Sequence, residues 1–201
     1  MRIAARSLAL VTVGMLTGSL IGASILHQPE VAPPADMAEF FAQYSAPDKH
    51  HNHLKSLVGT WDSVMSFRMD PDAPEMQSRG TMVTTELFEG RFIQQDFKGD
   101  FLGQPFFGRS TMGFSKPHGE YQCTWIDNMS TTIYFSSGEC SADGKRFTLN
   151  GKELDPMTNQ PLAYRDVITI LDDNRHRMVR TYIDADGAEA EGFRIEYTRR
   201  R

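Results

Sequence analysis

Two short segments of this chain carry the residue types best suited to chemistry. The first runs from Trp125 to Ser130 and contains an indole, a carboxylate at Asp127 and a hydroxyl. Asp127 and Ser130 could hydrogen-bond to the backbone of their own turn, as Asp and Ser commonly do. Alternatively, Asp127 could face the mouth of a cavity, with Trp125 as part of its wall. The segment predicts either a structural turn or a ligand contact.

The second segment runs from Tyr164 to Asp166. Arg165 and Asp166 are adjacent, so on a strand their side chains point to opposite faces, and the one that points inward needs a partner. An inward Arg165 could form a structural ion pair with Asp127 or Asp96, or it could bind a ligand carboxylate. The candidate ligand-binding residues of the whole chain are therefore Trp125, Asp127, Ser130, Tyr164 and Arg165.

A third cluster consists of histidines near the start of the folded region. His50 and His53 have the i, i+3 spacing that places two metal ligands on one face of a helix. No further ligand pair is evident, so we predict no metal site. The chain also shows no Ser-His-Asp order, no glycine-rich phosphate loop and no paired zinc cysteines. These observations favour a binding protein over several major classes of enzyme.

Ten short strands are expected to position these residues. Beyond residue 58 the segments are short and are separated by turn sequences such as Asp143-Gly144 and Asp186-Gly187. Strands joined by such turns are antiparallel neighbours, because parallel pairing needs a crossover of about a dozen residues or more. The pattern predicts an all-β fold, a roughly ten-stranded antiparallel barrel with a short N-terminal helical lead-in. The expected strands are 60–69, 78–88, 91–101, 105–115, 119–126, 131–139, 145–152, 162–171, 176–184 and 191–199.

The alternation of apolar and polar residues along these strands is impure. Phe193, Ile195 and Tyr197 share one face of the last strand, but strand 162–171 has polar and apolar side chains on both faces. A sandwich core would exclude so many inward polar groups. A ten-stranded barrel is wider than the eight-stranded barrel that side chains can just fill, so it can enclose water or a ligand. The pattern predicts a lumen that binds a small, mostly apolar molecule.

The N-terminal region has the composition of an export segment. Arg2 and Arg6 precede an uncharged apolar run over residues 7–26, which predicts a signal peptide or an uncleaved membrane anchor. We therefore expect an exported protein, periplasmic or otherwise extracytoplasmic, that is either free or tethered by this segment. The expected organisation is residues 1–26 as signal or anchor, 27–47 as a linker and short helix, and 48–201 as the barrel domain.

Charge and cysteine content limit the partners and the cross-links. The chain has 21 basic and 26 acidic residues, and this excess of acid argues against nucleic acid, whose binding needs a concentrated basic face. Cys123 and Cys140 are the only cysteines. A hairpin turn near residues 127–130 would separate them by about 16 Å, beyond the ~7 Å limit for a disulfide. We predict two unbridged thiols.

Two sets of motifs resemble known families. Gly59-Thr60-Trp61 resembles the opening of a calycin, whose Trp plugs the closed end of the barrel, often with a basic residue of the last strand packed on it; Arg194 or Arg199 could do so here. Four motifs together resemble the bacterial family called domain of unknown function 1579. That resemblance implies a calycin-like barrel and no activity. The motifs are Leu57–Asp62, Thr124–Ser130, Asp155–Thr158 and Tyr164–Val167, and Asn159 stands where Gly is expected.

The resemblance to calycins also raises haem, because some ten-stranded members bind it through a histidine on a late strand. Only His176 is available there, and we place it in a turn, so we predict no haem. The leading hypothesis is a ligand-binding barrel. The alternatives are an isomerase or hydrolase that uses Asp127 or His51 as general base, and a structural or interaction module tethered to the membrane by residues 7–26.

Overall fold

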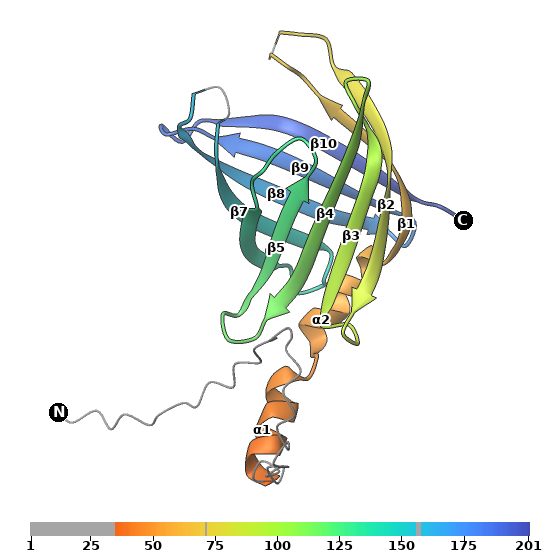
Figure 1. Ribbon diagram of the computed structural model, residues 1–201, viewed down its shortest axis with the longest axis vertical. Coiled ribbons are helices and arrows are strands. Elements are labelled where there is room, and N and C mark those ends of the chain that lie inside the picture. Colours follow the sequence, from red (N-terminus) through yellow and green to blue (C-terminus); the bar gives the residue numbers. More distant parts are fainter. Residues whose placement is uncertain (1–34, 71, 156–157) are drawn as a thin grey trace, which may run out of the picture.

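The computed structural model describes residues 35–70, 72–155 and 158–201, and within them it shows a closed barrel of ten antiparallel strands (Figure 1). The expected all-β barrel with a helical lead-in is confirmed. The predicted signal or anchor over residues 1–26 lies outside the described residues. In the described part of the chain, no helix has the length and apolar character needed to cross a membrane.

The strands lie within a few residues of their expected positions. Their bounds are β1 Gly59–Phe67, β2 Met76–Leu87, β3 Phe92–Phe101, β4 Gln104–Ser115, β5 Glu120–Asp127, β6 Tyr134–Cys140, β7 Arg146–Leu154, β8 Pro161–Asp172, β9 Arg175–Ile183 and β10 Glu189–Arg199. Two helices and a short 3-10 turn precede them: α1 Ala35–Ser45, α2 Lys49–Leu54 and η1 Lys55–Leu57.

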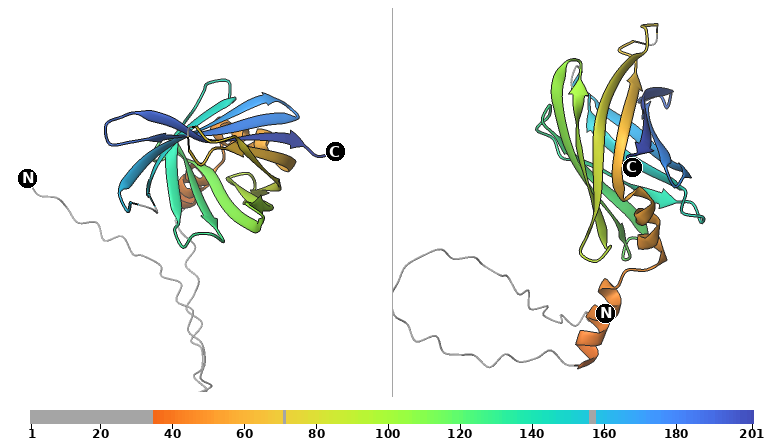
Figure 2. Two further views of the ribbon diagram at one scale, coloured as in Figure 1. Left: turned by 90° about the horizontal axis from the view of Figure 1, so that it is seen from above. Right: turned by 90° about the vertical axis from the view of Figure 1, so that its right-hand side faces the viewer.

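Each strand pairs with its neighbours in sequence, and β1 closes the barrel by pairing with β10 (Figure 2). This order follows from the short turns between strands, which leave no room for crossovers. In the longer connection between β7 and β8, Asn159 has a φ of 55°. Asn tolerates this left-handed conformation, so it can take the place of the expected Gly.

The helix α2 and the turn η1 cover one end of the barrel. Asp48 caps α2 by accepting a hydrogen bond from the backbone N–H of His50, at 2.9 Å. The Tyr121 hydroxyl at the start of β5 donates to the carbonyl of His50 and contacts His53 Nδ1 at 2.8 Å. Leu54 packs into the same end, which we call the floor of the barrel. The opposite end, where β5 and β7 finish, is the mouth.

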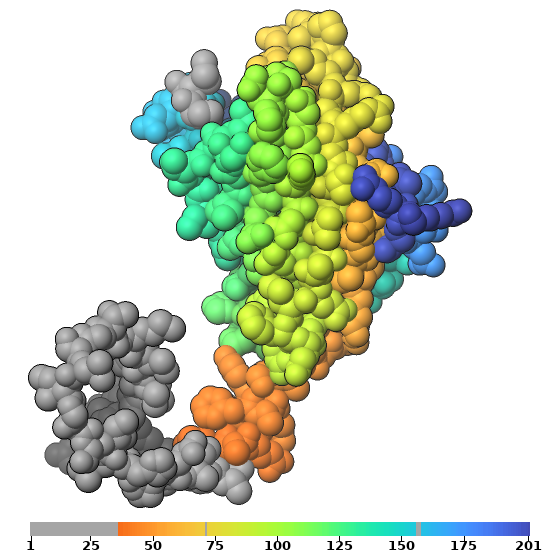
Figure 3. Space-filling view, turned by 45° about the vertical axis from the view of Figure 1, so that its right-hand side comes forward, coloured from red at the N-terminus to blue at the C-terminus, as the bar shows by residue number. Residues whose placement is uncertain are grey.

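The helix α1 protrudes below the floor (Figures 1 and 3). Its apolar residues recur at i, i+3, i+4 and i+7, the spacing of one helical face, but their side chains are between 48% and 59% exposed. Side chains of the barrel reach the end of α1, where Arg91 donates to the carbonyl of Ser45 and Lys116 to that of Gln43. The helix therefore presents an uncovered apolar face, formed by Met37, Phe40, Phe41 and Tyr44.

Trp61 closes the floor from within. Its side chain is 1% exposed, and its indole N–H donates to the carbonyl of Leu57 at 2.8 Å. Of the two basic candidates, Arg199 is the one that packs on the ring, with its guanidinium carbon 4.0 Å from the ring centroid. Gly59 approaches the same guanidinium so closely that a Cβ there would overlap it, and its φ of 136° also favours glycine.

The two cysteines lie far apart along the same hairpin. Cys123 is opposite Ser136 in the β5–β6 ladder, and Cys140 lies at the far end of β6. Both thiols are free. Cys140 therefore lies four residues beyond the partner of Cys123, one residue fewer than the separation of about 16 Å implied.

We predict that Trp61→Ala lowers the free energy of unfolding by about 3–5 kcal/mol, because it removes a buried aromatic side chain and leaves a cavity in the floor. Denaturant unfolding of residues 27–201 would measure this loss. Trp125→Ala is the matched control, since this second Trp is only partly buried and should cost less. An unchanged unfolding midpoint in Trp61→Ala would contradict the role of Trp61 as a plug.

Candidate functional site

A cavity of about 500 Å³ occupies the lumen between the floor and the mouth. Its lining is largely apolar and aromatic, with a small set of polar and charged groups. Inward residues mostly alternate with outward ones along each strand, so most lining side chains lie two residues apart in sequence. Apolar lining residues include Met65, Met82, Phe97, Ile168, Met178 and Ile195.

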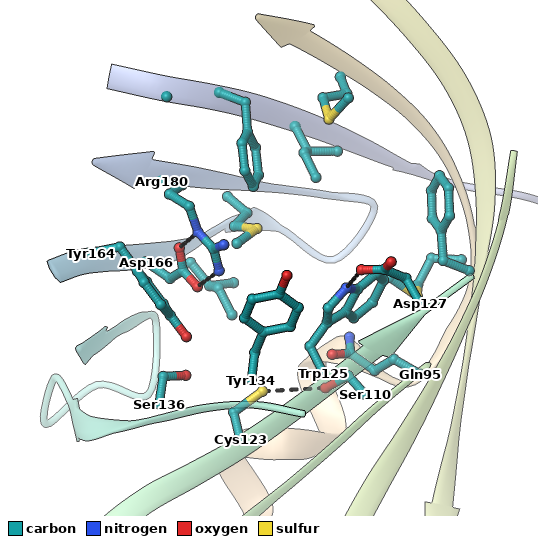
Figure 4. A pocket seen from close by; sticks show the side chains of 18 of the residues that line it. Gln95, Ser110, Cys123, Trp125, Asp127, Tyr134, Ser136, Tyr164, Asp166 and Arg180 are labelled. Carbon is teal, nitrogen blue, oxygen red and sulfur yellow. Dashed lines mark hydrogen bonds and ion pairs between the residues drawn. The ribbon is translucent and has the colours of Figure 1, made fainter. Parts of the chain in front are cut away.

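The main charged cluster is centred on Arg180 of β9 (Figure 4). Its Nε and one terminal nitrogen donate to the two carboxylate oxygens of Asp166 on β8, at 2.8 and 2.7 Å. Its other terminal nitrogen lies 3.6 Å from Glu153 on β7. The rings of Tyr164 and Phe193 lie 4.0 and 5.3 Å from the guanidinium carbon. The guanidinium is therefore engaged along its edges by carboxylates and packed against aromatic rings.

Burial changes the pKa values in this cluster. Burial alone would lower the pKa of Arg180, but the hydrogen bonds that Arg180 donates to Asp166 and the charge of that carboxylate raise it above its usual value. Burial also raises the pKa of Glu153, and the charge of Arg180 and a hydrogen bond from Tyr182 offset only part of this rise. Arg180 therefore stays charged, and Glu153 is the carboxyl group that is least well compensated.

The predicted turn residues lie at the mouth. Trp125 donates its indole N–H to Asp127 at 2.8 Å, and the other oxygen of Asp127 accepts from the backbone N–H of Met129 at 2.9 Å. Ser130 accepts from the Tyr134 hydroxyl at 3.1 Å. Trp125, Asp127 and Ser130 all line the cavity as well, so the turn and the lumen share the same side chains.

Trp125 can adopt this position because the neighbouring residue of β4 has no side chain. The indole lies against Gly108, where a Cβ would overlap the ring. Tyr164 also lines the cavity, from the opposite wall, and the guanidinium group of Arg180 packs on its ring. Four of the five candidate ligand-binding residues therefore share one cavity.

Arg165 is the exception. We expected its side chain to point into the lumen, and the structure shows that it does not. Arg165 is paired with Glu189 at 2.5 Å on the outer surface of the barrel, and it does not line the cavity. Asp166 points inward instead, because adjacent strand residues face opposite sides. Its partner is Arg180, directly opposite in the β8–β9 ladder.

Sequence reasoning missed Arg180 and Glu153. A signal for Arg180 was present, because it alternates with Met178 and Tyr182 along one face of β9, and both of these line the lumen. Glu153 likewise follows Leu149 on the inward face of β7. A full assignment of faces to every strand would have found both.

Of the two candidate general bases, only Asp127 lines the cavity. His51 lies in the cap of α2, where its Nδ1 contacts Asp48 at 3.0 Å, outside the cavity lining. Asp127 lies at the mouth and Arg165 on the outer surface. The set His51, Asp127 and Arg165 thus has no common site.

Across residues 35–70, 72–155 and 158–201 no three His, Cys, Asp or Glu side chains group as metal ligands would.

The placement of His176 in a turn is wrong. His176 lies in β9, is 3% exposed and lines the floor of the cavity. Its ring contacts Trp61 edge-on and stacks on Tyr197, each with centroids 4.3 Å apart, and its Nδ1 has no hydrogen-bond partner. Burial, together with the charge of Arg199, lowers its pKa to about 3. The imidazole is therefore neutral at physiological pH.

The profile of a family described as "Protein of unknown function (DUF1579)" matches residues 46–199, which include the whole barrel and its cavity. The chain belongs to this family. The family resemblance drawn from the four motifs is thereby confirmed. A search of curated proteins gives no match.

Two solved structures resemble this DUF1579 protein to different degrees. The crystal structure of Rv2717c from M. tuberculosis has a TM-score of 0.57 at 13% identity, covering 78% of this chain and 100% of its own. A de novo designed fluorescence-activating β-barrel has a TM-score of 0.37 at 18% identity, covering 73% of this chain and 95% of its own. The first similarity shows the fold alone, and the second is too weak to carry an argument.

We predict that His176 makes the protein less stable in acid. Its pKa is about 3 in the folded state and about 6.5 when unfolded, so below about pH 6.5 the unfolded chain binds a proton that the folded chain does not. The contribution of His176 to the free energy of unfolding is fully present above that pH. It falls by about 1.4 kcal/mol per pH unit as the pH decreases toward 3. Denaturant unfolding at several pH values would measure it.

The control for this prediction is His176→Phe, which keeps an aromatic ring between Trp61 and Tyr197 but cannot be protonated. Other carboxyl groups contribute to acid unfolding in both proteins, so the difference between the two curves reports on His176. Parallel curves between about pH 6 and pH 4 would contradict the prediction.

Proposed function

We propose that this protein binds a small, largely apolar molecule in the lumen of its barrel. The observation that carries the proposal is the cavity of about 500 Å³, open at the mouth and lined mainly by apolar and aromatic side chains. Ligand pockets are typically about 300–1,000 Å³ and combine such a lining with a few placed polar groups. Arg180, Glu153 and Asp127 supply those polar groups here.

The simplest alternative is a barrel whose lumen is filled by side chains, and the structure argues against it. Trp61 is fully buried in the floor, yet Trp125 and the methionines of the wall leave the space above it open. Of the two residues suggested as general base, His51 lies outside the cavity and Asp127 lines it, so the enzyme alternative depends on Asp127 alone.

We expect residues 27–201 to bind the neutral dye Nile red with enhanced fluorescence. Met178→Trp should weaken binding by about tenfold or more, because it fills part of the lumen. Val179→Trp is the matched control, since the neighbouring side chain points to the outer face. Equal loss in both variants, or no binding by the parent, would contradict lumen binding.

Native mass spectrometry of the protein purified from its own cell envelope would test the proposal independently. A reproducible extra mass that disappears on denaturation identifies a carried molecule. The same extra mass should be reduced in Met178→Trp and retained in Val179→Trp.

A second candidate function, a module held at a membrane surface, is favoured by one observation. The apolar face of α1 is uncovered, and α1 follows shortly after the apolar run of residues 7–26. A helix with one aromatic and apolar face can lie in a lipid interface. In this proposal the protein is exported and residues 7–26 anchor it, with α1 resting on the membrane and the barrel mouth facing away.

We expect residues 27–201 to float with phosphatidylcholine vesicles in a density gradient. The double variant Phe40→Ser with Phe41→Ser should reduce the floating fraction several-fold. Ile133→Ser, at the mouth, is the control, because that side chain is equally apolar and 72% exposed. Flotation that does not depend on Phe40 and Phe41 would contradict the role of α1.

A further inference from the structure

The described lining of the lumen carries an excess of negative charge. Its carboxylates are Asp127, Glu153 and Asp166, and its only permanent cation is Arg180. His176, the other basic group of the lining, is neutral. The lining therefore combines a mostly apolar surface with a net negative charge.

Arg180 is not available to bind an anionic ligand. Asp166 occupies its Nε edge with two hydrogen bonds, and Glu153 lies 3.6 Å from the remaining terminal nitrogen. Tyr164 and Phe193 pack around the guanidinium. A ligand carboxylate would have to displace Asp166 or Glu153 and would leave a buried carboxylate without a partner, which is costly.

Glu153 is the acceptor best placed to meet a ligand. It is the penultimate residue of β7, next to the mouth, and its side chain is 11% exposed. Its 3.6 Å contact to Arg180 is longer than the 2.7 Å contact of Asp166, so Arg180 holds Glu153 less tightly than it holds Asp166. Asp127 lies at the mouth on β5, and Figure 4 shows Tyr134 between the Arg180–Asp166 pair and the Trp125–Asp127 pair.

We infer that the ligand of this barrel has an apolar body and a cationic or hydrogen-bond-donating head group, such as an amine, which Glu153 and Asp127 receive at the mouth. This inference rests on the proposed function and specifies the class of ligand. A buried cation beside these carboxylates offsets their surplus charge, whereas a carboxylate adds to it. Burial, and to a smaller extent the charge of Asp166, raises the pKa of Glu153, and a bound cation would stabilise its charged form.

The test uses three probes with one rigid body, namely aminoadamantane, adamantanol and adamantane carboxylate. Isothermal titration calorimetry of the full chain at about pH 7, where the amine is protonated and the acid ionised, would give their affinities. We expect the amine to bind at least about tenfold more tightly than the carboxylate, with the alcohol between them. Nile red fluorescence on the same sample reports separately on whether the lumen binds anything.

Glu153→Gln should reduce the preference for the amine over the alcohol several-fold. Glu196→Gln is the matched control, because it removes the same charge from a carboxylate that pairs with Arg177 on the outer surface. If Glu153→Gln does not fold, Asp127→Asn provides a second variant with the same expected direction.

Each other outcome contradicts the inference in a distinguishable way. A carboxylate that binds as tightly as the amine, with Nile red bound, overturns the inference and leaves the proposed function standing. Nile red binding without binding of any adamantane probe also overturns it, because the head group then decides nothing. Failure of both the dye and the probes overturns the proposed function itself.

Discussion

Closure of the sheet between β1 and β10 is the constraint on which the rest of the barrel depends. An open sheet of ten strands would leave two unpaired edges, whereas closure pairs every strand on both sides. Arg199, at the end of β10, stabilises this pairing of β1 with β10. Its guanidinium lies over Trp61, one terminal nitrogen donates to the carbonyl of Val58, and Nε donates to the carbonyl of Asp173, each at 2.8 Å. One side chain thus joins the entry to β1, the plug and the β8–β9 turn.

Closure with ten strands leaves space that side chains do not fill, and the charges in that space need an explanation other than stability. Transferring three carboxylates and a guanidinium into a lumen carries a desolvation penalty, and apolar residues of similar volume commonly give equal or greater stability. The Arg180–Asp166 pair is fully satisfied, so it can be understood as a fixed part of the wall. Glu153 has weaker compensation, which is the arrangement expected of a recognition group.

The sequence predicted the architecture well because strands and turns are local. Turn sequences placed nearly every strand, and Gly59-Thr60-Trp61 located the floor. The candidate site was predicted less completely because it depends on which face each strand turns inward. A shift of one residue moves every side chain to the other face, and β-bulges near Ile170 and Gly192 change the register within β8 and β10.

The two errors, on the orientation of Arg165 and the placement of His176, arise because the inward face of a strand depends on contacts with other strands. Arg165 and Asp166 were recognised as a pair with opposite orientations, but nothing local decided which one faced the lumen until Arg180 was placed opposite Asp166. His176 lies one residue inside β9, and its burial depends on Trp61 and Tyr197, which come from other strands. Contacts between residues so distant in sequence cannot be obtained from the spacing of residues alone.

The separation of chemistry along the barrel axis implies an orientation for the ligand. The floor consists of Leu57, Tyr197 and a neutral His176, groups that an apolar body can contact without loss of hydrogen bonds to water. Glu153 and Asp127 both lie where their strands end at the mouth. An amphiphilic ligand would therefore enter with its apolar part first and leave its polar head at the mouth, where partial hydration lowers the cost of holding charge. The opposite orientation would bury the head group at the floor, where Leu57, Tyr197 and the neutral His176 offer no negative charge to balance a cation.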